Sequence, residues 1–305
     1  MEPMSDLDDA TPAVSYEPPL EPTECQDYAA IVLYYRLGAT VEKTIDALMA
    51  QTYPPVEIIV VDNASNDGVV ERLLADRQNC PSLQLRRNRG YAGGMNAGAN
   101  ALKTSTPLLL FLTHEVILEP DCMENLLNAV RVQKHTLVGP VLTRGNTGEV
   151  WSRGGIITKS GDVKHLVRDE KYSDIEWIDG ACMLIDSLTF REINGFDEDY
   201  FLYWEDVDIS NRVQMHGSIS CVSSARARQD TETAPIYFRT RNQVLFWRKR
   251  RQWRLVTVAV LRAIAKIFIR DIPRRRTRSI LARVAALKDG FSGRLSLRHL
   301  SAREA

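Results

Sequence analysis

The chain has 305 residues, a net charge of zero and a hydrophobic fraction of 44%, which is enough to build the core of one large or two small domains. Its five cysteines are widely spaced and contain no CxxC pair, which argues against a disulfide framework and against a zinc site. The N-terminus lacks the basic and then apolar pattern of an export signal, so we expect a cytoplasmic protein.

The charge is unevenly distributed along the chain. Residues 1–26 contain seven Asp and Glu and no Lys or Arg, whereas the segment after Trp247 is dominated by Arg and Lys. Such asymmetry suggests ends that meet different surroundings. We expect an acidic flexible arm over residues 1–28, an α/β domain over 29–245 and a basic, amphipathic helical tail over 246–305.

Apolar runs alternate with helical spacings through the first half of the chain. Strands are predicted at 29–33, 57–61, 83–85 and 107–112, and helices near 41–49, 69–76 and 120–132. A strand, a helix and a strand in this order indicate a right-handed parallel crossover. The fold class is therefore α/β, with a Rossmann-like, mostly parallel central sheet and helices on both faces.

Polar residues follow each predicted strand, where α/β sheets bind their ligands. The first strand is followed by Tyr34 to Arg36, the second by Asp62 to Gly68, the third by the glycine-rich segment Asn88 to Gly98, and the fourth by Thr113 to Glu115. A glycine-rich loop can bring backbone N–H groups to a phosphate, and a carboxylate can hold a divalent ion. The alternative for these segments is an Asx-rich turn and a tight loop at a helix start.

An aromatic run and an acid-tipped helix follow the turn at Gly195. Aromatic side chains there can form one wall of a cleft, and Glu205 and Asp206 open the helix. We expect the helix N-terminus to favour the charged forms of both carboxyls, which makes either a candidate general base. The alternative is that both only cap the helix while Asp208 pairs with Arg212.

Four motifs carry a resemblance to a known family. In order, these are VEIIVVDNASNDG, NRGYAGGMNAG, GACMLI and GFDEDYFLYWEDVDISNRV. Together they resemble family-two glycosyltransferases, most closely the rhamnosyltransferase-like branch, over roughly Ala29 to Arg248. The resemblance implies a GT-A catalytic domain with a nucleotide-sugar half at 29–118 and an acceptor half at 119–245. It also implies inverting transfer from a nucleoside-diphosphate sugar.

The resemblance also implies roles for individual residues. Asp206, with Glu205 beside it, would be the catalytic base, and Glu115 would hold a divalent cation, Mg²⁺ or Mn²⁺. The acceptor pocket would be formed by Gly180, Ala181, Cys182 and Trp204. The donor would be bound by Tyr34, Arg36, Asp62, Asn63, Asn88, Gly94, Asn96 and Arg241.

The sequence departs from the family pattern around the metal. Thr113-His114-Glu115 has Thr where Asp or Asn is usual, and Gln229 lies near the position of a histidine that often joins the metal. A Mg²⁺ ion held by one carboxylate and the phosphates is compatible with these residues, because Mg²⁺ keeps several waters. We expect His114 to make a local hydrogen bond. A non-catalytic nucleotide-sugar binder is the alternative function.

Donor, acceptor and location follow as further expectations. The branch resemblance favours a dTDP-sugar such as dTDP-rhamnose, with UDP-sugars next, and an acceptor that is a glycan, a lipid-linked glycan or a small natural product. The tail predicts either a basic amphipathic helix on an anionic membrane, at the inner face, or a helix packed on the domain with a solvated charged face. No nucleic-acid module is recognisable.

Overall fold

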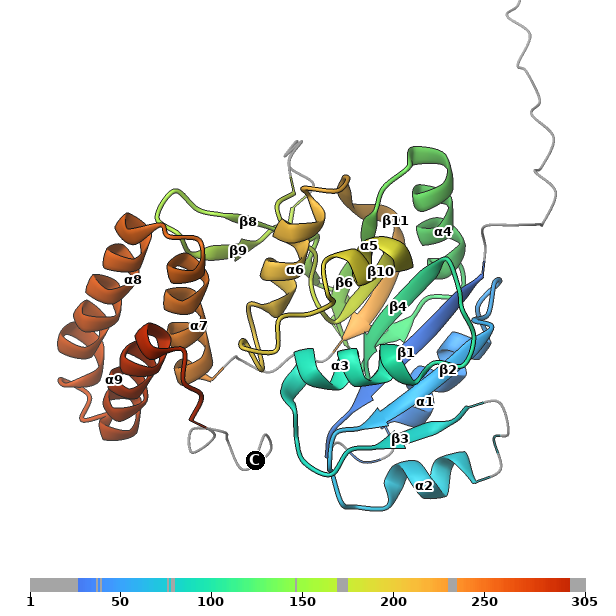
Figure 1. Ribbon diagram of the computed structural model, residues 1–305, viewed down its shortest axis with the longest axis horizontal. Helices are drawn as coiled ribbons and strands as arrows, with labels where there is room; N and C mark the ends of the chain where they lie inside the picture. Colours follow the sequence, from blue (N-terminus) through green and yellow to red (C-terminus); the bar gives the residue numbers. More distant parts are fainter. Residues whose placement is uncertain are drawn as a thin grey trace, which may run out of the picture.

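The computed structural model describes residues 27–296 except 37, 39, 76, 78, 79, 146, 169–174 and 230–234. The predicted acidic arm therefore lies outside the described residues up to residue 26. Nine strands of the described part form one sheet, in the order β3-β2-β1-β4-β10-β6-β11-β5 with β7 paired to β6. Helices cover both faces of this sheet, as Figure 1 shows. The predicted α/β class is confirmed.

The first half of the chain builds a parallel four-stranded unit with the order β3-β2-β1-β4. Each crossover carries a helix, as the alternation of apolar runs predicts. The elements in chain order are β1 (Tyr28–Tyr34), α1 (Thr40–Met49), β2 (Glu57–Asp62), α2 (Val69–Leu74), β3 (Ser82–Gln84), α3 (Gly90–Ala101) and β4 (Leu108–Thr113).

The second half continues the same sheet with mixed strand directions. Strand β10 runs antiparallel to both β4 and β6, and β11 runs parallel to β6. The elements are β5 (Ile117–Leu118), α4 (Cys122–Gln133), β6 (Leu137–Arg144), β7 (Val150–Ser152), β8 (Gly155–Ile157), β9 (Val163–His165), β10 (Cys182–Asp186), α5 (Ser187–Glu192), α6 (Glu205–Val213) and β11 (Ile219–Gln229). Strands β8 and β9 form a separate small hairpin.

Strand β1 is buried on both faces, and its alternate residues belong to two different cores. Ala30 and Val32 pack into the core on the side of α1 and α4, whereas Ile31 and Leu33 pack into the core on the side of α3, α5 and α6. Successive side chains of a strand point to opposite faces, so a single residue of offset decides which face a side chain reaches. This alternation decides which of the residues predicted for the site reach the active-site pocket.

The C-terminal part is a helical layer made of α7 (Ile236–Lys249), α8 (Trp253–Lys266), the π-helical turn η1 (Ile267–Asp271) and α9 (Thr277–Ser292). Helix α7 packs against both α8 and α9. The expected boundary at residue 245 falls inside α7, so the basic tail begins as the continuation of a buried helix. Within the described residues, no helix is both long and apolar enough to cross a membrane.

Candidate active site

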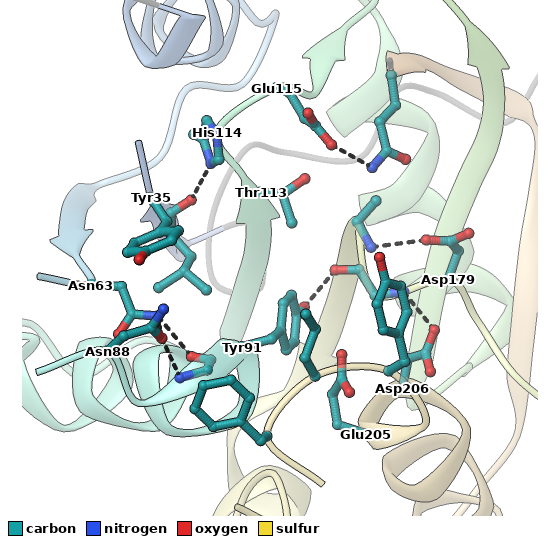
Figure 2. Close-up of a pocket in the computed structure, with 18 of the residues that line it drawn as sticks. Tyr35, Asn63, Asn88, Tyr91, Thr113, His114, Glu115, Asp179, Glu205 and Asp206 are labelled. Carbon is teal, nitrogen blue, oxygen red and sulfur yellow. Dashed lines mark hydrogen bonds between the residues drawn. The ribbon is translucent and has the colours of Figure 1, made fainter. Parts of the chain in front are cut away.

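A pocket opens at the edge of the sheet where β1, β2 and β4 end. Its volume is about 320 Å³, which lies within the range of small-molecule sites. Figure 2 shows side chains from both halves of the chain around it. The lining residues are Leu33, Tyr35, Asn63, Asn88, Gly90, Tyr91, Thr113, His114, Glu115, Trp151, His165, Asp179, Gly180, Ala181, Phe201, Leu202, Tyr203, Glu205, Asp206 and Gln229.

The topology of the sheet explains why distant segments meet at this pocket. Parallel strands β1, β2 and β4 end at one edge, and the antiparallel β10 begins there, with Cys182 opposite Leu112. The residues just before β10 therefore face the residues just after β4. The N-terminus of α6 is held against them through Asp206, whose Oδ2 accepts a hydrogen bond from the Gly180 backbone N–H at 3.3 Å.

One side of the pocket is a closed hydrogen-bond network of amides. The Asn63 side-chain amide donates to Asn88 Oδ1 and to the Gly90 carbonyl, both at 3.0 Å, and its Oδ1 accepts from the Arg89 N–H at 2.8 Å. Asn88 Oδ1 also accepts from the Gly90 N–H at 2.8 Å. Because these groups satisfy one another, the end of β2 and the start of α3 are held in one arrangement.

The glycine-rich segment is a helix, so the prediction of a glycine-rich loop is wrong. Residues Gly90–Ala101 form α3, and the N–H groups of its first two residues are already engaged, by Asn88 Oδ1 and by the Phe201 carbonyl. A Cβ on Gly90 would lie 2.1 Å from the Phe201 carbonyl oxygen, and Gly90 has a φ of +70°. The glycine is needed for this close approach and backbone conformation.

The other side of the pocket holds three carboxyl groups. Asp179 precedes β10, while Glu205 and Asp206 begin α6. Glu205 is buried, and among the described residues its Oε2 has no hydrogen-bond partner. A Cβ on Gly180 would lie 3.2 Å from Asp206 Cβ, so the short residue allows the two segments to approach closely. The carboxyls are crowded and only partly hydrogen-bonded.

Burial raises the pKa of both α6 carboxyls. The pKa of Glu205 lies well above its usual value because of desolvation and then the charge of Asp206. Desolvation, followed by the charge of Asp179, raises the pKa of Asp206 to about 7 despite the hydrogen bonds from Val207 and Gly180. The expectation that the helix N-terminus holds both groups charged is therefore wrong in direction, because desolvation and like-charge repulsion outweigh the helix dipole.

The Thr113-His114-Glu115 segment lines the top of the pocket in Figure 2. The Gln229 side-chain amide donates to Glu115 Oε1 at 3.1 Å. Thr113 Oγ1 and Gln229 Oε1 are buried and have no partner within the described part of the chain. Hard oxygen atoms of this kind suit Mg²⁺ or Mn²⁺, although no group of three His, Cys, Asp or Glu that could hold a metal occurs among the described residues. The residues fit an ion that takes its remaining ligands from phosphates and water.

His114 makes the local contact expected of it. Its Nδ1 lies 2.9 Å from the Leu33 carbonyl oxygen, which fixes the ring against the end of β1. Burial lowers its pKa to about 4, so the ring is neutral near pH 7. With the proton on Nδ1, the ring donates to Leu33 and turns an uncharged face to the pocket.

Seven of the residues expected at the site meet at the pocket, and eight do not line it. The seven are Asn63, Asn88, Glu115, Gly180, Ala181, Glu205 and Asp206. Three of the others surround the loop after β2: the Tyr34 hydroxyl donates to Asp67 at 2.6 Å, the Arg36 N–H donates to Ser65, and Asp62 Oδ1 accepts from the Ser65 N–H. They form a mostly buried polar cluster around this loop, named the polar shelf below.

The remaining four in the domain core have packing or positioning roles. Cys182 and Trp204 are buried, in the core beside α1 and in the core beside α7 respectively. A Cβ on Gly94 would lie 2.4 Å from a methyl group of Leu33, so Gly94 allows α3 to pack on β1. Asn96 holds the turn before the aromatic run through both the N–H and the carbonyl of Phe196.

Arg241 was expected beside the phosphates, but it does not line the pocket. It is fully buried and donates to the carbonyls of Asp199 and Arg294. The neighbouring Asn242 side-chain amide contacts the carbonyls of Tyr200, Leu202 and Tyr203 at 2.6–2.8 Å. These two side chains, here named the loop clamp, hold the segment that leads into α6.

The clamped segment has an unusual backbone. Phe201, Tyr203 and Trp204 have φ values of 63°, 66° and 77°, which non-glycine residues rarely adopt. Such conformations persist only where surrounding contacts enforce them. Phe201 and Tyr203 reach the pocket, so the expected aromatic wall is present in part, while Phe196 and Tyr200 are buried in the core.

The pocket residues that the sequence did not single out include Asp179, His165 and Trp151. His165 Nδ1 lies 3.6 Å from Asp179 Oδ2 and 3.0 Å from Ser152 Oγ, and its ring contacts Trp151 with 4.9 Å between centroids. Asp179 directly precedes the predicted site residues Gly180 and Ala181, and this position in the sequence was a signal for the site. His165 and Trp151 come from short strands that carry no comparable signal.

The family match agrees with this geometry. The model of glycosyl transferase family 2 matches residues 29–193, more than half of the chain. The chain belongs to glycosyl transferase family 2.

Relatives place this family-2 glycosyltransferase in the rhamnosyltransferase-like branch. It is 26% identical over 219 residues to the N-acetylglucosaminyl-diphospho-decaprenol L-rhamnosyltransferase of Mycobacterium tuberculosis, covering 62% of this chain and 71% of the relative. It is also 38% identical over 54 residues to the rhamnosyltransferase WbbL of Escherichia coli, covering 17% of this chain and 20% of the relative. The prediction of the family and branch is confirmed.

A solved structure supports the same fold. The mannosyltransferase of Pyrobaculum calidifontis, solved with GDP-Man and Mn²⁺, superposes with a TM-score of 0.57 at 16% identity and covers 89% of this chain and 88% of its own. At this identity the likeness concerns the fold, which is of the GT-A type. The chain is thus a glycosyltransferase with a GT-A fold.

Proposed function

We propose that the protein transfers rhamnose, or a related hexose, from a nucleoside-diphosphate sugar to an acceptor hydroxyl with inversion of configuration. The observation that carries this proposal is Asp206, a carboxyl at the pocket surface whose pKa is raised to about 7. A general base works best when its pKa lies near the operating pH. Asp206 is also fixed in position, at the N-terminus of α6 and against Gly180.

The donor would occupy the side of the pocket formed by the ends of β1, β2 and β4. Asn63 and Asn88 line this side, and the polar shelf of Tyr34, Arg36 and Asp62 lies next to it. One carboxylate oxygen of Asp62 is buried without a hydrogen-bond partner among the described residues, which would suit an N–H or hydroxyl of the nucleoside. We assign the nucleoside to this shelf, with dTDP favoured over UDP.

The transfer would take place as a direct displacement. Asp206 accepts the proton of the acceptor hydroxyl while that oxygen forms a bond to the anomeric carbon. The bond between the anomeric carbon and the diphosphate oxygen breaks on the opposite face, and the nucleoside diphosphate leaves with the bonding pair. Glu115, with Thr113 and Gln229 near it, would hold a divalent cation, which when bound neutralises charge on the diphosphate.

The acceptor would enter beside Asp179, Tyr203 and the α6 carboxyls. Burial raises the pKa of Glu205, which favours its protonated form, and in that form it would donate a hydrogen bond to a hydroxyl of the acceptor. The Mycobacterium tuberculosis relative is named for a diphospho-decaprenol acceptor. By this likeness we propose a lipid-linked glycan as the acceptor, and a protein that works peripherally at the inner face of the membrane.

The proposal is tested by a transfer assay over a panel of nucleotide sugars. The purified chain is incubated with dTDP-rhamnose and with UDP- and GDP-hexoses, together with a short-chain N-acetylglucosaminyl-diphospho-isoprenoid and Mg²⁺ or EDTA. We expect dTDP-rhamnose to give a disaccharide-lipid product, and NMR to show that the anomeric configuration has been inverted. A product with retained configuration would contradict the displacement by Asp206.

The alternative function is a non-catalytic nucleotide-sugar binder, favoured by the unusual Thr113-His114-Glu115 segment. The same panel separates the two functions. Binding of a nucleotide sugar in a thermal-shift assay, without transfer or hydrolysis in either Mg²⁺ or EDTA, would identify a binder.

A further inference from the structure

The helices α8 and α9 form a hairpin on the far side of α7 from the sheet. Figure 1 shows both helices at the edge of the molecule, away from the strands that end at the pocket. The turn that joins them is η1 followed by residues 272–276. Residues 264–278 are named the hairpin tip below.

The hairpin tip exposes large apolar side chains. Phe268, Ile269 and Ile272 are 64%, 76% and 47% exposed, and the three lie within five consecutive positions. Single exposed apolar residues are common on protein surfaces, but a group of them marks a site of interaction. Further exposed apolar side chains lie on both helices, Leu261 and Ile264 on α8 and Leu281 and Val284 on α9.

Cationic side chains surround these apolar residues. Arg270, Arg274, Arg275, Arg276 and Arg278 are all exposed. The one acidic residue between Arg250 and Lys288 is Asp271, which is buried and paired with the Arg283 guanidinium at 2.8 Å. The tip therefore presents positive charge and apolar surface to solvent with no exposed carboxylate to balance it.

We propose that the hairpin tip docks on an anionic lipid bilayer. Phe268, Ile269 and Ile272 insert among the acyl chains, and the arginines contact lipid phosphates and the negative surface. The Arg283–Asp271 pair joins the start of the turn to α9, so the apolar residues are presented on a fixed turn. The tip would then act as a rigid anchor, in contrast to a separate helix that forms in the membrane plane.

Two other partners are disfavoured by the same observations. A second copy of the chain would bring two strongly positive surfaces together, which costs free energy through like-charge repulsion. A nucleic acid would pair with the arginines, but its phosphate backbone offers nothing for the three exposed apolar side chains. An anionic bilayer satisfies both features.

The proposal rests on the proposed function only in that a lipid-linked acceptor gives membrane docking a purpose. It is tested by co-sedimentation of the full chain with vesicles that contain neither donor nor acceptor, so docking and transfer can fail independently. Vesicles of 30% phosphatidylglycerol in phosphatidylcholine are compared with pure phosphatidylcholine, at 0.1 M and 0.5 M NaCl. We expect binding to the anionic vesicles, weakened at high salt, and little binding to the neutral ones.

Two variants separate the apolar and electrostatic contributions. F268S/I269S/I272S removes the apolar residues, and R274Q/R275Q/R276Q removes three charges. Each variant is expected to weaken binding to anionic vesicles by at least about tenfold. For R274Q/R275Q/R276Q, this follows because each basic residue at such a surface contributes about fivefold. Matched controls remove exposed residues of the same kind from the α/β domain: V132S/L188S/M215S for the apolar set and K43Q/K134Q/R191Q for the charged set. Both controls should bind as the wild type does.

Three results would overturn the proposal. One is equal binding of the tip variants and their controls. Another is wild-type self-association without lipid, seen by light scattering and abolished by F268S/I269S/I272S, which would identify a second copy as the partner. The third is tighter binding to RNA or DNA than to anionic vesicles in a competition experiment.

Discussion

The two sides of the pocket differ in how their polar groups are satisfied. On the side of β2 and α3, the amides of Asn63 and Asn88 form a closed network with the Gly90 backbone. On the side of β10 and α6, three carboxyls are crowded together, and Glu205 keeps a buried oxygen without a partner among the described residues. The first arrangement stabilises the fold locally, whereas the second costs free energy.

This difference suggests a division of labour. A satisfied amide network provides a rigid surface for binding, because no group has to move or change its charge. Crowded carboxyls with raised pKa values accept protons readily, which suits proton transfer. The free-energy cost of holding the carboxyls together is offset by the loop clamp, Arg241 and Asn242, which fixes the strained segment before α6. Each of the following changes acts on one side of the pocket and should leave the other intact.

The largest effect is expected from Asp206→Asn. The variant keeps the shape of the side chain but cannot accept the proton, so kcat should fall by about 10²–10⁴-fold while the affinity for the donor stays unchanged. Single-turnover kinetics and calorimetry with the nucleotide measure the two quantities. Asp208→Asn is a poor control because Asp208 is buried and pairs with Arg212 and Arg250. Asp199→Asn is a better one, because the pair of Asp199 with Lys249 is exposed to solvent. Turnover close to wild type would remove Asp206 from the role of base.

The pH profile should show the raised pKa of Asp206 directly. The carboxyl must be ionised to accept a proton, so kcat/KM should fall about tenfold per pH unit below about 7. Asp179→Asn removes a neighbouring charge that raises this pKa, so the acidic limb should move to lower pH. An acidic limb that stays in place in the Asp179 variant would show that Asp179 does not influence Asp206.

The same raised pKa affects stability in the opposite sense. The folded state binds a proton at Asp206 more tightly than the unfolded chain, so this contribution is complete below pH 4 and is lost as the pH rises through about 7. Asp206→Asn should therefore raise the melting temperature more at pH 8.5 than at pH 5. An equal change at both pH values would contradict the raised pKa.

Asn242→Ala should disturb the carboxyl side of the pocket, although Asn242 does not itself line the pocket. The change leaves the carbonyls of Tyr200, Leu202 and Tyr203 without their donor, at a cost of about 1–3 kcal/mol in the free energy of unfolding. We expect kcat to fall by more than the donor Kd changes, because Asn242 makes no direct hydrogen bond to Asn63 or Asn88. Gln243→Ala is the matched control, because Gln243 is the next residue along the chain and its side-chain amide donates instead to the Gly161 carbonyl on the β8–β9 hairpin. Equal losses in both variants would indicate a general loss of stability.

The smallest effect is expected from Asn63→Ala, on the amide side. It opens the network at the start of α3, so the KM for the donor should rise about tenfold, as for one or two lost hydrogen bonds, while kcat changes little. Asn100→Ala, an exposed asparagine on α3, serves as the control. A fall in kcat without a change in KM would mean that the two sides are not separable.

The sequence predicted the amide side in part and the carboxyl side incompletely. Strand ends locate Asn63 and Asn88 because parallel strands end at one edge. Cys182 was misplaced because the parity of β10 turns its side chain into the core beside α1. Arg241 was expected at a charged ligand, whereas in the structure backbone carbonyls surround its guanidinium.

What the sequence determined by itself is the order of strands and helices in the first half of the chain, the family, and the identity of the carboxyls that open α6. These follow from apolar alternation and from motifs, which are local in the chain. The tertiary structure alone decided the raised pKa values of those carboxyls, the use of the glycine-rich segment as a helix, and the approach of His165 to Asp179. Burial and neighbouring charge depend on segments far apart in the sequence, so only the folded chain determines them.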